Sequence, residues 1–166
     1  MNKQTSSVSK TEQKYSISLL TYSSSKPFDV VVSDFEKQLG RFDEARALSS
    51  GAGLTAAVDN MKGSSGLMIL AVLPMDRTLP ALISSSIRAV QYLVGNPLIA
   101  SSMAEHNTLA ALYAPPRVLI YTEDGKTCIS YDQPSDIFGR LASTHIDETA
   151  RDLNEKFERL VKTALS

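Results

Sequence analysis

The residue types best suited to bind a ligand in this sequence are Gly95, Asn96 and Pro97, which lie where an apolar segment ends and helical spacing begins. Gly95 permits an unusual backbone dihedral angle or a close approach, Asn96 can cap a helix with its side-chain oxygen, and Pro97 suits a first helical turn. The exposed amides of such a helix start attract anions. We therefore expect a small anionic or polar ligand here, against an apolar wall that includes Leu98. The candidate ligand-binding residues are Gly95, Asn96, Pro97, Met103 and His106.

A second explanation of this segment needs no ligand. The same three residues can simply turn a strand into a helix and satisfy the amides at the helix start. In that case the chain is a structural or protein-interaction domain, and its surface should carry an apolar patch rather than a pocket.

The third possibility is an enzyme that uses His106 as a general acid or base. Glu105 and His106 are the only adjacent carboxylate and imidazole in the chain, and an imidazole near its ordinary pKa can transfer protons at neutral pH. Adjacent helical positions point about 100° apart, so the two cannot easily form one dyad. A carboxylate, either Glu105 or Asp132, would have to reach the His106 imidazole through the tertiary fold. The alternative explanation is that His106 is an ordinary surface residue of the helix.

Metal and cofactor chemistry have little support in the sequence. His106, His145 and Cys128 lack the local spacing of helical metal sites, so we expect no metal. Cys128 lies inside a predicted strand, where a small buried hydrophobic side chain is the common role. Neither a nucleotide-binding glycine loop nor a Ser-His-Asp signature is present, and we expect no cofactor.

The elements that must position these residues follow in the order strand, helix, strand, strand, helix, hairpin, helix. The predicted strands are 15–21, 67–73, 87–94, 117–122 and 127–132, and the predicted helices are 28–39, 97–112, 134–141 and 147–165. Asp124 and Gly125 predict the hairpin turn. The order favours an α+β fold in which an antiparallel-rich sheet packs against helices in two layers.

The segment 41–66 and the chain ends complete the domain prediction. Residues 1–13 are expected to form a flexible tail, and residues 14–166 a single domain. Within this domain, the segment 41–66 is rich in Ala, Ser and Gly, with helical patches at 44–48 and 54–61. Farther along the chain, residues 78–86 are expected to form a short helical or irregular link. The segment 41–66 is either a pair of packed helical turns or a cover over a pocket.

Composition narrows the function classes. The 166 residues are 43% hydrophobic and carry a net charge of −1, without the basic stripe that nucleic-acid binding needs. The chain has neither a secretory signal at its start nor an apolar run long enough to cross a bilayer. We therefore expect a cytoplasmic protein that binds neither nucleic acid nor membrane.

The sequence resembles the domain of unknown function 302 family, especially its fungal branch. The resemblance rests on Gly95-Asn96-Pro97, on Met103 and His106 in the following helix, and on a hairpin that ends in Tyr131-Asp132-Gln133-Pro134. It implies an α+β domain similar to TATA-binding-protein-like folds, commonly found as a homodimer, and it implies no particular reaction. The chain departs from the family in two places: Asp76-Arg77 stands where bacterial members have Asp-His, and 41–66 is longer than the usual link.

The apolar strands independently suggest a partner. Residues 67–73 and 118–121 are apolar on both strand faces, so helices on one side of the sheet would leave the other side apolar. Large exposed apolar patches mark partner surfaces, and two-fold symmetry is the commonest arrangement. We expect a homodimer in which a second copy covers this face, unless the segment 41–66 of the same chain covers it.

Overall fold

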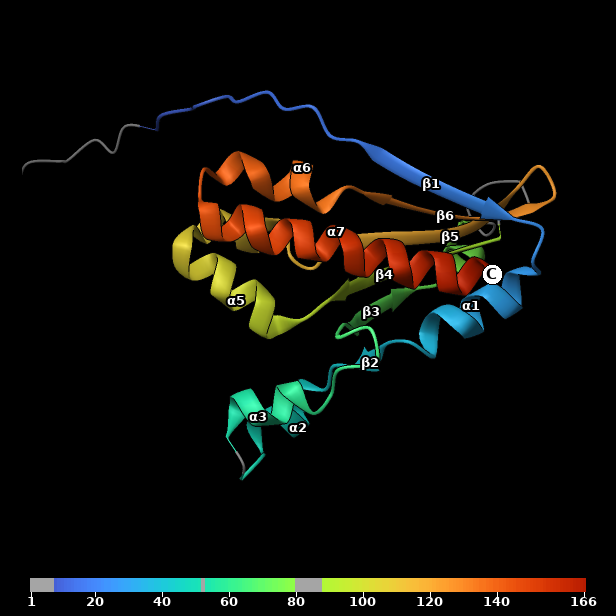
Figure 1. Ribbon diagram of the computed structural model, residues 1–166, viewed down its shortest axis with the longest axis horizontal. Helices are drawn as coiled ribbons and strands as arrows, with labels where there is room; N and C mark the ends of the chain where they lie inside the picture. The colour runs from blue at the N-terminus through green and yellow to red at the C-terminus, as the bar shows by residue number, and fades with distance from the viewer. Residues whose placement is uncertain (1–7, 52, 80–87) are drawn as a thin grey trace, which may run out of the picture.

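The computed structural model describes residues 8–51, 53–79 and 88–166. In this part of the chain, one sheet has the strand order β1-β6-β5-β4-β3-β2, and its neighbouring strands are antiparallel except for the parallel pair β2–β3 (Figure 1). The strands are β1 (Leu19–Ser24), β2 (Gly40–Arg41), β3 (Met68–Leu73), β4 (Ala89–Gly95), β5 (Arg117–Glu123) and β6 (Lys126–Asp132). The predicted α+β class is confirmed.

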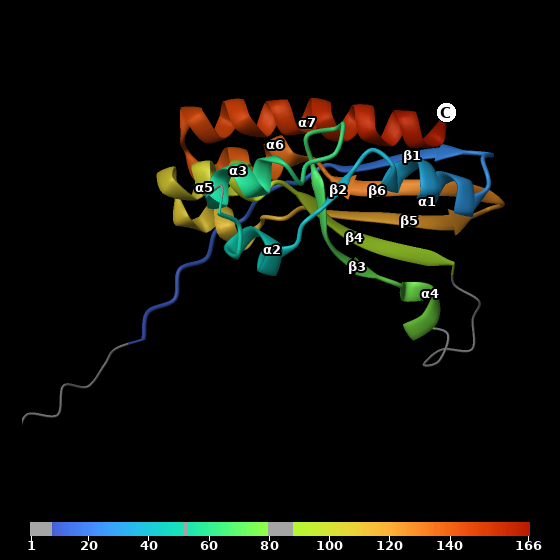
Figure 2. The ribbon, with the colours of Figure 1, turned by 90° about the horizontal axis from the view of Figure 1, so that it is seen from below.

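The helices α1, α5, α6 and α7 gather on one face of this sheet, as the edge-on view in Figure 2 shows. The helices are α1 (Phe28–Glu36), α2 (Glu44–Leu48), α3 (Leu54–Asp59), α4 (Met75–Thr78), α5 (Pro97–His106), α6 (Pro134–Phe138) and α7 (Thr144–Leu165), with 3-10 helices η1 (Thr108–Leu112) and η2 (Gly139–Leu141). The long helix α7 crosses the covered face and is flanked by α1, α5 and α6 (Figure 1). Most of the predicted link 78–86 lies outside the described residues.

The main core lies between α7 and the sheet. The predicted apolar face of α7 is buried, and the Phe157 ring lies 5.4 Å from the Tyr131 ring of β6. Alternate strand residues such as Val90, Tyr92 and Val94 point into the same layer because side chains along a strand alternate between faces. The period of the apolar residues therefore determined which face of each element is buried.

The hairpin β5–β6 confirms the turn prediction. Asp124 and Gly125 have φ angles of 49° and 73°, the left-handed conformations that a two-residue hairpin turn needs. The strands pair from Glu123 with Lys126 to Val118 with Tyr131.

Several predicted boundaries differ from the structure for local reasons. The helix expected over 97–112 breaks at Asn107, whose backbone is extended and whose side chain accepts a hydrogen bond from Leu109 N and donates one to Leu141 O. The first strand begins at Leu19 rather than at residue 15, because β6 ends at Asp132. Just before β1, Ser18 instead bonds Gln133 N and the Asp136 carboxylate.

The segment 41–66 begins in β2 and contains α2, α3 and most of a return loop, residues 63–67, that leads into β3. It packs around a second small core of Ala47, Val58, Met61 and Met68, with Phe42 and Leu98 beside it. These helices extend past the β2 edge of the sheet (Figure 1). That this segment covers the open face of the sheet therefore stays a prediction, with its observed contact at Met68 on β3.

A crossing of two backbone segments fixes the position of the return loop. Gly40 N and Gly63 N both donate to Leu67 O, each at 3.0 Å. A Cβ on Gly40 would lie 1.6 Å from Met61 O, and a Cβ on Gly63 would lie 2.3 Å from Gln38 O. Only glycine fits at this crossing, because the neighbouring atoms are backbone.

The face of the sheet opposite α7 stays partly open. Leu93 and Leu119 on this face are half-buried, and Leu73 at its β3 side is 39% exposed. On the same face, Tyr121 of β5 pairs with Cys128 of β6, and its hydroxyl lies 3.3 Å from Ser130 Oγ. In the described part of the chain, no helix combines the length and apolar character needed to cross a bilayer.

Candidate functional site

The start of α5 forms as the sequence predicts. Asn96 is extended, its Oδ1 accepts a hydrogen bond from Leu98 N at 2.9 Å, and Pro97 occupies the first helical position. The other side-chain atom of Asn96, Nδ2, donates to Gly66 O at 3.1 Å. Asn96 therefore connects the end of β4, the start of α5 and the return loop before β3.

These contacts leave few donors for an anion at the helix start. Pro97 has no amide hydrogen, and Leu98 N already donates to Asn96 Oδ1. The Asn96 amide nitrogen faces a carbonyl oxygen of the protein. The geometry is better suited to holding backbone segments together than to binding a charged ligand.

An apolar cavity of about 270 Å³ lies beside this helix start. It is lined by four of the five predicted ligand-binding residues, namely Gly95, Asn96, Pro97 and Met103. The other lining residues are Phe42, Leu70, Ile99, Ala100, Ala114, Pro115, Pro116, Phe138 and Leu153. They come from β3, α5, α6, α7, the segment after β2 and the segment before β5, so the tertiary fold assembles the cavity.

The chemistry of the cavity is that of a binding site for an apolar group. Among the described residues that line it, none has an ionisable side chain. Gly95 is needed for its shape, since a Cβ there would lie 3.2 Å from Pro115 Cβ and 3.9 Å from Leu70 Cδ1. Apolar walls with a few polar groups at the entrance are typical of small-molecule sites.

Helical spacing was the signal that could have found the missed α5 residues. Ile99 and Ala100 lie four and three positions before Met103, so the three share one side of α5. Leu98, expected as the apolar wall, instead packs beside the second core. Leu153 belongs to the predicted apolar face of α7, but its position in a cavity depends on neighbours far away in sequence.

His106 lies outside this cavity. Its Nδ1 atom is 2.9 Å from Ser102 O, and its ring stacks on the His145 ring with the centroids 4.2 Å apart and an angle of 18° between planes. Glu105 is an exposed neighbour, and Asp132 is exposed at the end of β6. In the described part of the chain, no ion pair joins either histidine to a carboxylate.

Cys128 and the possible metal ligands are similarly dispersed. Cys128 is 5% exposed, and burial raises the pKa of its thiol, which disfavours the nucleophilic thiolate. Over residues 8–51, 53–79 and 88–166, no three or more His, Cys, Asp or Glu side chains gather as a metal site would require.

The comparison with protein families decides the classification. The sequence model of the family described as Domain of unknown function DUF302 matches residues 49–164. The chain belongs to the DUF302 family. The match includes every cavity-lining residue except Phe42, while β1, α1 and β2 precede it. A comparison with curated protein sequences gives no significant match.

A solved DUF302 protein has the same fold. The crystal structure of an uncharacterized conserved DUF302 protein from Bacillus stearothermophilus superposes with a TM-score of 0.66 at 18% sequence identity. The superposition covers 88% of this chain and 97% of that one. At this identity the likeness shows the fold alone and carries no activity.

Proposed function

We propose that this chain is a binding protein for a small, largely apolar molecule. The observation that carries the proposal is the 270 Å³ cavity beside the start of α5, lined by residues from six separate parts of the chain. The cavity is open to solvent on one side, so part of its apolar wall lies in contact with water. A bound apolar group would remove that surface from water, which is favourable.

The lining favours an apolar ligand over the anionic one expected from the helix start. An anion in this cavity would lose its hydration without gaining a cationic partner, because no ionisable side chain lines the described walls. Asn96 already uses both of its amide atoms within the protein. A polar substituent on the ligand would therefore face the opening of the cavity.

The volume also limits the size of the ligand. Engineered apolar cavities of about 150 Å³ hold benzene. A cavity of about 270 Å³ accommodates a single or fused aromatic ring system of comparable shape, or a short branched alkyl chain. Indole is a suitable neutral probe.

Filling the cavity tests the proposal. We expect indole to shift the methyl NMR signals of Ile99 and Leu70, and Ala100→Trp to weaken its binding at least about tenfold, because the added ring occupies the same space. Ser101→Trp is the matched control, since Ser101 is the next residue of α5 and is exposed. The control variant should bind indole as the unmodified protein does.

Both variants are compared by thermal unfolding before titration, so that loss of the fold is not counted as loss of binding. Indole binding that persists in a folded Ala100→Trp variant would place the ligand elsewhere. Absence of indole shifts at Ile99 and Leu70 in the unmodified protein would contradict the proposed site.

We also infer that the chain assembles as a homodimer through the open sheet face. Leu93 and Leu119 on this face are half-buried in the single chain, and burying apolar side chains against a second copy would be favourable. Leu119→Glu should produce a monomer in sedimentation velocity at micromolar concentration. Leu109→Glu on η1, where Leu109 is 57% exposed, should remain a dimer; a monomeric unmodified protein would contradict the inference.

Catalysis by His106 remains a prediction without a supporting observation. The His106 ring stacks on His145, away from the cavity. Glu105 and Asp132 offer it no carboxylate contact in the described structure, so the binding function is the one we propose.

A further inference from the structure

A second hollow, of about 450 Å³, lies between α7 and the return loop that precedes β3. Both ribbon views show this loop beside α7 (Figures 1 and 2). The lining of this hollow is mostly polar, unlike that of the apolar cavity. The lining residues are Gln38, Ser64, Ser65, Gly66, Lys156, Arg159, Leu160 and Thr163.

The α7 wall of this hollow carries two cations. Lys156, Arg159 and Thr163 are spaced three and four residues apart, so they form one stripe along the helix. Lys156 is held partly inside, with its side chain 22% exposed, whereas that of Arg159 is 64% exposed. Among the described residues that line the hollow, none is a carboxylate.

The carboxylates that pair with these cations lie one helical turn away. Lys156 Nζ is 3.0 Å from Asp152 Oδ2, and Arg159 NH1 is 3.5 Å from Glu155 Oε2. The Arg159–Glu155 pair is exposed and therefore weak, and the partly buried Lys156 ammonium has three N–H donors, more than its one carboxylate partner requires. Both cations can therefore turn toward an anion in the hollow at little cost.

The loop wall offers a hydroxyl group and a close backbone approach. Ser65 is occupied, because its Oγ donates to Gln38 O at 2.8 Å and accepts from Leu67 N at 3.3 Å. Ser64 is exposed, and its Oγ makes only a long 3.5 Å contact with Gln38 O. Gly66 has a φ angle of 78°, and a Cβ there would lie 3.9 Å from Lys156 Cε, so the Lys156 stem passes directly over the loop.

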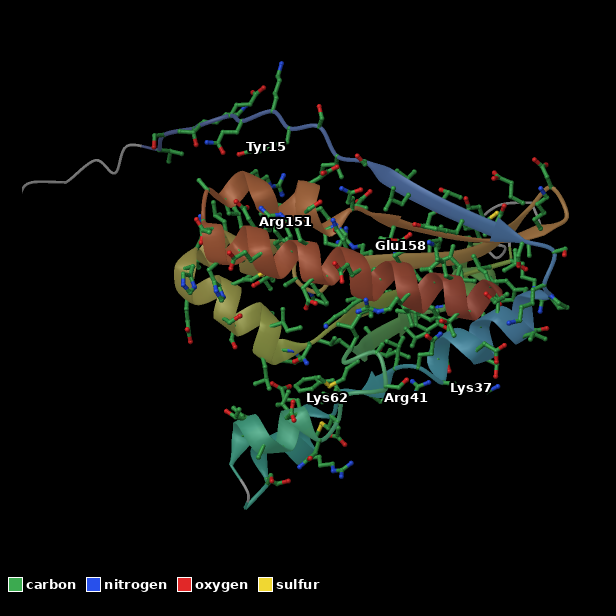
Figure 3. The ribbon with its side chains drawn as sticks, in the orientation of Figure 1. Tyr15, Lys37, Arg41, Lys62, Arg151 and Glu158 are labelled. Atoms are coloured by element: carbon green, nitrogen blue, oxygen red, sulfur yellow. The ribbon has the colours of Figure 1, made fainter. Side chains whose placement is uncertain are left out.

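Three further cations lie on the loop side of the hollow. Lys62, which directly precedes the loop, and Arg41 and Lys37 follow one another along the side of the molecule below α7 (Figure 3). Glu158 lies on the other side of α7 in the same view. Each of the three is paired with a carboxylate: Lys37 with Asp34, Arg41 with Glu36 and Lys62 with Asp59, of which only Asp59 is exposed, so these charges are largely offset.

We propose that this hollow binds the phosphate group of a small phosphomonoester. Lys156 and Arg159 supply charge-assisted hydrogen bonds to the phosphate oxygens, and the Ser64 hydroxyl donates from the loop side. The hollow is larger than a phosphate ion requires, which leaves space for the esterified alcohol. This site is separate from the apolar cavity and does not depend on the function proposed for it.

Titration with glycerol 3-phosphate and with inorganic phosphate, at constant ionic strength in a calorimeter, tests the site. We expect glycerol 3-phosphate to bind the unmodified protein. The double variant Lys156→Gln/Arg159→Gln should raise its Kd at least about tenfold, because two charge-assisted interactions are lost. The matched control Arg151→Gln/Lys162→Gln removes the same charge from α7 outside the hollow and should change the Kd less than about twofold.

The outcomes separate the possible sources of the phosphate. Equal affinity for both probes would assign the site to the phosphate group alone, whereas tighter binding of glycerol 3-phosphate would confirm contacts with the alcohol. Equal weakening by both double variants would reduce the effect to net charge and overturn the proposal. Absence of binding by either probe at millimolar concentration would also overturn it.

Discussion

Replacing Gly40 with alanine is expected to lower the free energy of unfolding by at least about 3 kcal/mol. The new Cβ would lie 1.6 Å from Met61 O and 2.8 Å from Gly63 N. Both contacts are with backbone atoms, so no side-chain rotation can relieve them. The two hydrogen bonds from Gly40 N and Gly63 N to Leu67 O would have to lengthen or break. Urea denaturation of the variant measures the loss.

Gly51→Ala is the matched control for this substitution. A Cβ on Gly51 meets no atom within 4 Å, and its backbone does not lie in the left-handed region. Alanine there reduces the freedom of the unfolded chain, so stability should change by less than about 1 kcal/mol or rise slightly. If Gly40→Ala and Gly51→Ala were equally stable, the backbone crossing would not constrain the loop.

Asn96→Ala is expected to cost about 2 kcal/mol. Loss of a helix cap costs about 1 kcal/mol, and here the substitution also removes the hydrogen bond that Asn96 Nδ2 donates to Gly66 O. A buried or half-buried carbonyl that loses its donor adds a penalty of about 1 kcal/mol. The measurement is again the midpoint and slope of urea denaturation.

Asn96→Asp separates the two contributions. The aspartate retains an oxygen that can accept from Leu98 N, and its negative charge is favourable at the start of α5. It loses the donor to Gly66 O. We expect it to recover about half of the stability lost in Asn96→Ala; full recovery would show that the loop contact contributes nothing.

The same pair of variants bears on the ligand hypothesis for Asn96. If Asn96 serves only as a connection between α5 and the loop, indole affinity should follow the stability of the fold and stay nearly unchanged in folded protein. A large loss of indole affinity in a folded Asn96→Asp variant would instead indicate direct contact with the ligand. The geometry, in which both amide atoms are engaged by the protein, favours the first result.

Local features of the fold were predictable because their causes are local. The Asp124-Gly125 turn depends on the dihedral preferences of two residues, and the start of α5 depends on Asn96 and Pro97 alone. The buried face of α7 follows from helical spacing. Each of these depends on interactions within a few residues, which a single sequence records directly.

Other features were missed because they depend on segments that are distant in sequence. Gly40 directly follows the predicted helix 28–39, and only the structure shows that it opens β2 and crosses the backbone at Gly63. Leu98 and Ile99 are adjacent apolar residues, and Leu98 packs beside the second core while Ile99 faces the cavity. Helical spacing to Met103 can place Ile99 on the cavity side of α5, but only the tertiary structure shows what Leu98 packs against.

The α+β class, the family and the hairpin follow from local patterns in the sequence. So does the helix start, which brings Gly95, Asn96, Pro97 and Met103 to one place. The tertiary structure decided that this place is an apolar cavity, that His106 stacks on His145 outside it, and that Lys156 and Arg159 face a serine loop. Caps, turns and periodicity act between neighbouring residues. A cavity forms where several separately encoded elements pack imperfectly, so its walls and its chemistry arise only when the chain has folded.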